Sequence, residues 1–197
     1  MSFLSYFIPQ LVYHSSSHYN KKIEVREING RNVLLVNGIQ QTGGYTEKLW
    51  KEGMRNIHGK KILVFGVGGG TVFSNFPDAQ ITAVDIDPEI IRIGKKYFGL
   101  GKLSNLTLIQ QDARMFISRK KYDLIIVDLY IGNDVPAFVS QKPFLKKCMS
   151  FLLPGGQMVI NYFSQKDQET KAHALRQIII GATVKPVLRN IFVYVVK

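Results

Sequence analysis

The chain has 197 residues, 46% of them hydrophobic, which fits one globular domain with a sizeable core and a small extension. Lys and Arg outnumber Asp and Glu by 26 to 14, and a net charge of +12 would suit binding to nucleic acid. The basic residues are scattered along the chain, however, so nucleic acid is an unfavoured partner. Cys148 is the only cysteine, which excludes an internal disulfide and a cysteine-rich metal site and fits a cytoplasmic location. The four histidines show no metal-ligand spacing, and we expect no metal site.

The first 44 residues are predicted to form an N-terminal extension. Residues 1–13 are apolar, but they are too short to span a membrane and lack the basic leader of a signal peptide. We expect no membrane association and packing of this segment on the domain or on a partner subunit. In residues 22–36, an alternating stretch and an apolar run flank Asn29-Gly30, which predicts a β-hairpin. We therefore divide the chain into a hairpin extension, residues 1–44, and a main domain, residues 45–197. The expected partner subunit is a second copy of this chain, in a homodimer.

The centre of the predicted main domain is a glycine-rich turn after a buried strand. A helix over residues 45–57 is expected to lead into a strand at residues 62–65, whose unalternated apolar side chains are typical of a parallel strand buried on both faces. Four glycines crowd the turn that follows: Gly66, Gly68, Gly69 and Gly70. Glycine permits positive φ and has no Cβ, so a ligand can lie against the backbone where a following helix presents unpaired N–H groups. The turn therefore predicts a nucleoside-binding site.

An acidic residue ends the next predicted strand, residues 80–84. Asp85 stands nineteen residues after Gly66, the distance at which a βαβ unit brings a carboxylate to ribose hydroxyls. We expect the neighbouring Ile86 to line the same site. Asp87 and Pro88 predict the N-cap and the first turn of the following helix, so we interpret Asp87 as a cap rather than a catalyst.

Strands and helices continue to alternate up to the C-terminus. In chain order we expect a strand at residues 106–109, a short helix through Phe116, a strand at 122–127, a helix at 138–152, a strand at 157–162, a helix at 165–180, and a closing antiparallel pair at 183–188 and 191–196. This alternation predicts an α/β fold with a doubly wound, mostly parallel, Rossmann-like sheet, which binds ligands beyond the carboxyl ends of its strands. Asp85, Asp112 and Asp128 all fall at such ends.

With these motifs, the sequence resembles the spermidine synthase family, a branch of the class I methyltransferase fold that uses S-adenosylmethionine (AdoMet). The matching positions are Gln40, Tyr45 with Glu47, the glycine turn, Asp85, Asp112 with Ala113, and the strand that ends at Asp128. The resemblance implies that AdoMet or decarboxylated AdoMet is bound by Gln40, by the four glycines of the turn, by Asp85 with Ile86, and by Asp112 with Ala113. It also implies two catalytic candidates: Asp128, as a general base or a group that orients the acceptor, and Tyr45, lying over the crevice.

Two departures from the family pattern affect the expected substrates. Members that make polyamines have an aspartate at the position of Gly69, and they follow the catalytic aspartate with Ser-x-Asp-Pro where residues 129–132 read Leu-Tyr-Ile-Gly. Those acids serve the ammonium groups of decarboxylated AdoMet and of the polyamine. Their absence removes the charge complement that such cations need.

We therefore predict an AdoMet-type transferase, most simply one that transfers a methyl group from AdoMet to a small-molecule acceptor. The alternative is an aminopropyltransferase, a polyamine synthase that uses decarboxylated AdoMet, with Asp134 or Glu47 in place of the missing acids. A further alternative is a catalytically silent nucleoside-binding or RNA-binding subunit, which only the net charge of +12 supports.

Overall fold

The computed structural model describes residues 3–131, 134–164 and 166–197. Met1, Gly132 and Gln165, which belong to predicted segments or motifs, lie outside the described residues. In chain order the helices and strands are η1 (Phe3–Tyr6), β1 (Gln10–Ser15), β2 (Ile23–Ile28), β3 (Arg31–Val36), β4 (Ile39–Gln40), α1 (Gly44–Gly53), β5 (Lys61–Phe65), η2 (Thr71–Asn75), β6 (Gln80–Asp85), α2 (Pro88–Tyr97), η3 (Leu100–Lys102), β7 (Leu106–Gln110), β8 (Tyr122–Val127), η4 (Ala137–Ser140), α3 (Lys142–Phe151), β9 (Leu152–Phe163), α4 (Lys166–Ile178), β10 (Thr183–Val187) and β11 (Asn190–Val196), where η marks a 3-10 helix.

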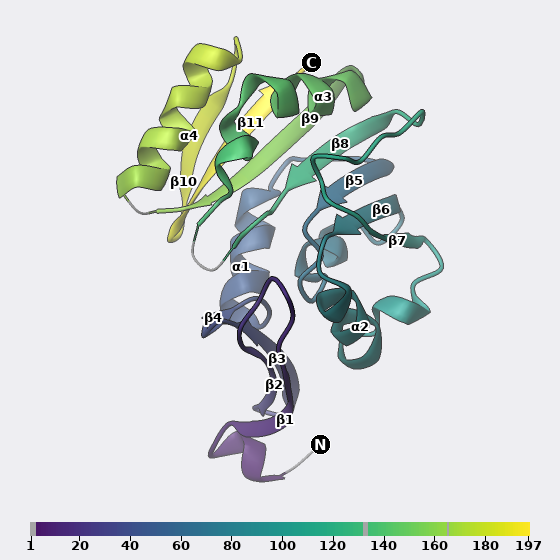
Figure 1. Cartoon of the computed structure of the whole chain (residues 1–197), viewed down its shortest axis with the longest axis vertical. Helices are drawn as coiled ribbons and strands as arrows, with labels where there is room; N and C mark the ends of the chain where they lie inside the picture. Colours follow the sequence, from purple (N-terminus) through teal and green to yellow (C-terminus); the bar gives the residue numbers. More distant parts are fainter. Residues whose placement is uncertain (1–2, 132–133, 165) are drawn as a thin grey trace.

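These strands form two sheets, which lie one above the other along the long axis of the molecule (Figure 1). The larger sheet has the order β10-β11-β9-β8-β5-β6-β7. Its strands from β9 to β7 are parallel neighbours, and β11 pairs antiparallel with both β9 and β10. The predicted α/β fold, the mostly parallel sheet and the antiparallel pair at one edge are confirmed. No helix of the described residues is long and apolar enough to cross a membrane.

The central strands of this sheet are buried on both faces, which explains their unalternated apolar sequences. In β5, Leu63 and Phe65 belong to a core shared with α3 and α4. Ile62 and Val64 point to the opposite face, into a core shared with α1 and α2. A one-residue change in register would exchange the two sets of side chains, so the helices on both faces fix the strand.

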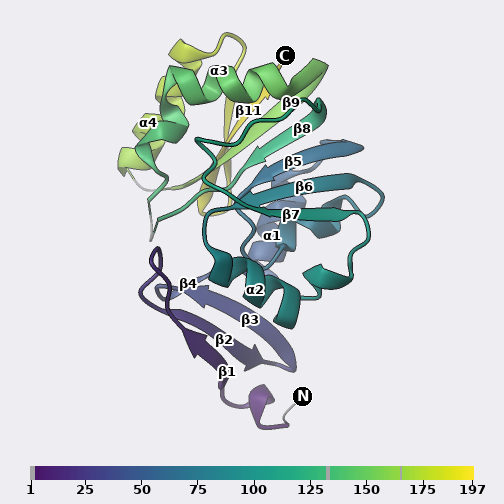
Figure 2. The same cartoon turned by 45° about the vertical axis from the view of Figure 1, so that its right-hand side comes forward.

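The smaller sheet is antiparallel, with the order β1-β2-β3-β4. It contains the predicted hairpin, whose turn places Asn29 and Gly30 at positive φ, as a tight hairpin turn requires. Ile23 and Leu34 join the same core as Trp50 of α1, and α2 lies beside this sheet (Figure 2). The larger sheet and the extension therefore share one continuous core.

Three local predictions are wrong. The glycine turn is followed by the short 3-10 helix η2 instead of an α-helix, because only six residues separate Gly70 from Pro77. The short helix expected to end at Phe116 is a single turn, in which the N–H groups of Met115 and Phe116 both donate to the carbonyl of Asp112. The helix expected at residues 138–152 is two helices, η4 and α3, because Pro143 stands in the first turn of a new helix.

The apolar segment at the N-terminus is largely uncovered within this chain. Phe7 is 72% exposed and Ile8 is 64% exposed, whereas Ser5 is buried and its carbonyl accepts a hydrogen bond from the N–H of Asn29, so the segment packs on the domain only in part. Packing on a partner subunit stays a prediction.

Candidate functional site

A pocket of about 300 Å³ opens at the carboxyl ends of the parallel strands, a volume at the lower end of the range for small-molecule sites. Among the residues that line it are nine of the predicted site residues: Gly66, Gly68, Gly69, Gly70, Asp85, Ile86, Asp112, Ala113 and Asp128. They come from four strand ends that are widely separated in sequence. The pocket therefore lies beyond the carboxyl ends of the strands, where open parallel sheets usually bind ligands.

The glycine turn is packed tightly on both sides. Gly66 has φ +95°, and a Cβ built on it would stand 2.0 Å from the carbonyl oxygen of Asp128. A Cβ on Gly69 would stand 2.1 Å from Cγ2 of Thr42, a buried residue between β4 and α1. Any side chain at these positions would therefore displace either the strand end that carries Asp128 or the segment that joins the two sheets.

Asp85 supports the turn from the next strand. Its Oδ2 accepts a hydrogen bond from the N–H of Val67 at 2.8 Å, and its Oδ1 accepts one from the N–H of Asp87 at 2.9 Å. Burial raises the pKa of Asp85 to about 6, against the opposing effect of these hydrogen bonds. A hydrogen bond from the backbone of Gly68 also lowers this pKa, so only part of the acceptor capacity of the carboxylate is left for a ligand.

Asp112 and Ala113 lie on the far side of the pocket. Arg114 pairs with Asp112, with 2.6 Å between Nη2 and Oδ2, and its backbone N–H donates to Oδ1 at 2.8 Å. These contacts with the guanidinium lower the pKa of Asp112. The carbonyl of Ala113 accepts a hydrogen bond from Lys147 Nζ at 2.6 Å. Asp112 therefore stays ionised with its own counter-charge.

Asp128 differs from Asp112 because it has no cationic partner among the described residues. Its Oδ1 accepts a hydrogen bond from Asn161 Nδ2 at 2.9 Å. Burial, opposed by the hydrogen bond from Asn161 and assisted by the charge of Asp85, raises the pKa of Asp128 to about 6. Two carboxyl groups with raised pKa values thus share one pocket, where a bound cation would stabilise their ionised forms and where proton transfer near neutral pH is favoured.

Two predicted site residues do not line this pocket. The side chain of Gln40 turns back, and its Nε2 donates to the carbonyl of Thr42 at 2.6 Å, while the neighbouring Gln41 lines the pocket. Tyr45 is 40% exposed; its hydroxyl accepts a hydrogen bond from the N–H of Arg189 at 3.1 Å and donates to Asn190 Oδ1 at 3.4 Å.

The two acids proposed to replace the missing ones are also not in the pocket lining. Glu47 lies 3.9 Å from Arg31, and both side chains are exposed. Asp134 is exposed, and its backbone pairs with Ile131. Neither carboxyl therefore stands in for the absent acids in the described pocket.

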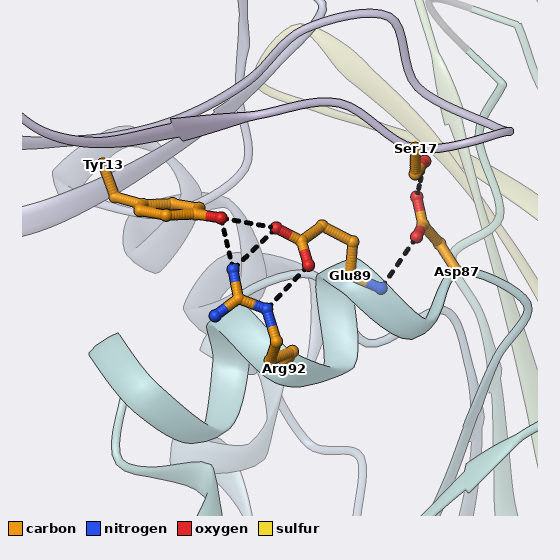
Figure 3. Close-up of polar contacts among 5 residues, drawn as sticks. All are labelled: Tyr13, Ser17, Asp87, Glu89 and Arg92. Carbon is orange, nitrogen blue, oxygen red and sulfur yellow. Dashed lines mark hydrogen bonds and ion pairs between the residues drawn. The ribbon is translucent and has the colours of Figure 1, made fainter.

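Sequence reasoning missed a polar clamp between β1, the loop after it and the start of α2 (Figure 3). Asp87 caps α2 through Oδ1, which accepts from the N–H of Glu89, as predicted. Its Oδ2 also accepts from Ser17 Oγ and from Asn20 Nδ2. Asn20 and the neighbouring Tyr19 line the pocket, so the clamp brings the small sheet to the pocket wall.

A second half of the clamp lies one turn along α2. The hydroxyl of Tyr13 donates to Glu89 Oε1 at 3.0 Å, and Arg92 Nε donates to Glu89 Oε2 at 2.7 Å (Figure 3). The guanidinium lowers the pKa of Glu89 to about 2. The only signal in the sequence was the cap at Asp87, because the partners on the small sheet stand about seventy residues away.

The described geometry can be compared with known proteins. A family model described as the spermine/spermidine synthase domain matches residues 17–196. The chain belongs to the spermine/spermidine synthase family. In sequence it is 32% identical over 114 residues to a polyamine aminopropyltransferase of Vibrio vulnificus, which covers 53% of this chain and 38% of that protein. It is 29% identical over 168 residues to a probable polyamine aminopropyl transferase of Bifidobacterium longum, covering 77% and 37%.

This member of the spermine/spermidine synthase family is also similar to proteins named as methyltransferases. The chain is 32% identical over 119 residues to the human eEF1A lysine and N-terminal methyltransferase, which covers 51% of this chain and 17% of that protein. The chain thus spans less than half the length of each of these three curated relatives. Among solved structures, spermidine synthase from Thermotoga maritima superposes with a TM-score of 0.73 at 15% identity, over 95% of this chain and 73% of that one. This similarity supports the fold.

Proposed function

We propose that this chain binds an AdoMet-type sulfonium nucleoside in the pocket and belongs to an enzyme that transfers a group from its sulfur to a small-molecule acceptor. The observation that carries the proposal is the pair Asp85 and Asp128, two carboxyl groups with pKa values raised to about 6 in one pocket. A sulfonium cation would stabilise the ionised form of both. The tight glycine turn supplies the backbone surface on which a nucleoside can lie.

The first candidate reaction is aminopropyl transfer from decarboxylated AdoMet. The family membership and the relatives named as polyamine aminopropyltransferases support it. Charge supports it as well: among the described residues that line the pocket, Arg114 is the only cationic side chain, and it is paired with Asp112. The carboxylate of intact AdoMet would therefore find no free counter-charge, whereas decarboxylated AdoMet has no carboxylate to neutralise. This order reverses the one expected from the sequence.

The second candidate is methyl transfer from AdoMet, which Gly69 favours. An acid at this position would need the space that Thr42 occupies, so no carboxylate can stand there to bind the ammonium group of an aminopropyl chain. The similarity to the eEF1A methyltransferase supports this candidate. A silent nucleoside-binding or RNA-binding role, the homodimer and the cytoplasmic location stay predictions.

In either transfer the protein would position the acceptor against the donor and remove the proton that the acceptor loses. When bound, the donor supplies a carbon that its sulfonium already activates for attack, so a near-attack geometry can provide much of the rate. Asp128, at the end of β8, would accept the proton that an acceptor amine loses. A pKa of about 6 keeps this carboxylate ionised at neutral pH and close to the operating range of a general base.

Binding and product analysis would test the proposal. The protein is titrated by calorimetry with AdoMet and with decarboxylated AdoMet, and is then incubated with each donor and a panel of amines. We expect tighter binding of decarboxylated AdoMet and formation of methylthioadenosine. Preference for AdoMet with formation of S-adenosylhomocysteine would favour the second candidate, and a lack of binding to both donors would refute the proposal.

A further inference from the structure

A line of side-chain amides runs behind Asp128, away from the pocket. Asn161 Nδ2 donates to Asp128 Oδ1 at 2.9 Å, and Asn190 Nδ2 donates to Asn161 Oδ1 at 2.8 Å. Tyr45 lies at the end that is farthest from Asp128, where its hydroxyl donates to Asn190 Oδ1 at 3.4 Å. The hydrogen bonds thus all run in one direction, from Tyr45 to Asp128.

The direction of this line determines which atom faces the carboxylate. An asparagine amide can present either its NH₂ or its oxygen. Because Asn190 donates to the oxygen of Asn161, the NH₂ of Asn161 is left to face Asp128. If Asn161 were flipped, its oxygen would lie against the oxygen of an ionised carboxylate, which is unfavourable. Asn190 therefore selects the orientation of Asn161 that stabilises ionised Asp128.

Both asparagines are buried and lie on rigid elements. Asn161 is 3% exposed and Asn190 is 1% exposed. They stand on the antiparallel neighbours β9 and β11, where Asn161 pairs with Phe192 in the strand register. In addition, the hydroxyl of Tyr130 donates to the carbonyl of Asn161 at 3.1 Å, which ties the loop after β8 to the same strand. Buried amides that are held by hydrogen bonds in this way have little freedom to rotate.

We propose that Asn161 and Asn190 are positioning residues that hold the Asp128 carboxylate ionised, with its Oδ2 directed to the pocket, for the transfer reaction. The proposal rests on the proposed function for its catalytic consequence. In this proposal Tyr45 acts outside the pocket, where its hydroxyl holds the side chain of Asn190 by a hydrogen bond. Within the described chain, Asn161 is the one hydrogen-bond donor to this carboxylate, so its loss would not be compensated.

The decisive experiment measures the titration of Asp128 directly. Carbon-13 NMR of the Asp128 carboxyl is followed from pH 4 to pH 9 in the wild-type chain, in Asn161→Leu and in Asn190→Leu. Two titratable groups interact electrostatically with this carboxyl, Asp85 and Tyr130, and both are retained in all three proteins. We expect the pKa of Asp128 to rise in both variants, more in Asn161→Leu, because the hydrogen bond that favours the charged form is lost or disordered.

Asn105→Leu is the matched control. The amide of Asn105 donates to the carbonyls of Pro77 and Ala79, so its loss costs structural hydrogen bonds without touching the pocket. This variant should leave the pKa of Asp128 unchanged. If Asn161→Leu does not fold, Asn190→Leu still tests the inference, because Asn161 stays in place and loses only the group that orients it.

Single-turnover rates complete the test once an acceptor is found. The acid limb of the pH–rate profile should move with the pKa of Asp128, and the rate should fall at least about tenfold, in the range expected for misplacing an acid-base group. An unchanged pKa in Asn161→Leu would overturn the inference, and so would a shifted pKa with an unchanged rate. If the wild-type chain transfers nothing with either donor, the proposed function fails, while the NMR titration still decides whether the asparagines control Asp128.

Discussion

Replacing Asp85 by alanine should weaken binding of the donor nucleoside. In the structure both oxygens of Asp85 already accept one backbone hydrogen bond, from Val67 at 2.8 Å and from Asp87 at 2.9 Å. The acceptor capacity that remains can receive ribose hydroxyls. Loss of these charge-assisted hydrogen bonds should cost about 1.5 to 3 kcal/mol, which corresponds to a Kd raised by roughly 10-fold to 150-fold.

The same substitution should also lower the free energy of unfolding, because it leaves two backbone N–H groups without their acceptor. We expect a loss of about 1 to 3 kcal/mol, measured by urea denaturation. Donor affinity is measured by calorimetry with AdoMet and decarboxylated AdoMet. Asp78→Ala is the control, since Asp78 is exposed just before β6 and should change neither quantity. A folded Asp85→Ala variant with wild-type affinity for both donors would refute the assignment of Asp85 to the ribose.

Three further outcomes are expected. Asp128→Asn should weaken donor binding at pH 8, because the carboxylate that faces the cation is lost, and at saturating donor it should lower the single-turnover rate by a factor on the order of 100; equal rates at saturating donor would make Asp128 a loop residue. Gly69→Ala should weaken donor binding and lower the free energy of unfolding by about 1 to 3 kcal/mol through the clash with Thr42, and Thr42→Ser, which removes Cγ2, should restore both. Donor binding should tighten as pH rises from 5 to 7.5, because Asp85 and Asp128, each with a pKa of about 6, must ionise to face the cation; a flat calorimetric pH profile would contradict this charge argument.

The elements that sequence reasoning located correctly are those in which local signals agree with the fold. The strand at residues 122–127 was predicted with the bounds that the structure has, because a continuous apolar run ends abruptly at Asp128. The start of α2 was found for a similar reason: Asp87 caps and Pro88 fits the first turn. The position of the pocket followed, because strand ends in a parallel sheet must meet along one edge.

The features that were missed depend on partners far away in sequence. Strand β1 has a mixed sequence whose burial scarcely alternates, and its pairing with β2 decides its structure. The side chain of Tyr45 carries no sign that it lies beside Asn190, 145 positions later. Asn161 looked like an ordinary strand residue and Asn190 like a turn residue. Such an asparagine is recognised as functional only when the carboxylate at the end of its hydrogen bonds is known.

The small sheet forms part of the pocket, although the sequence predicted only a hairpin extension. Two different contacts join it to the pocket wall. Asp87 accepts hydrogen bonds from Ser17 (Figure 3) and from Asn20, and Thr42, just after β4, fills the space beside Gly69. Because Asp87 also caps α2 and donates its N–H to Asp85, movement of the small sheet would disturb the carboxylate that we assign to the ribose. A donor that binds this carboxylate must therefore also stabilise the contact between the two sheets, since binding and docking share the same groups.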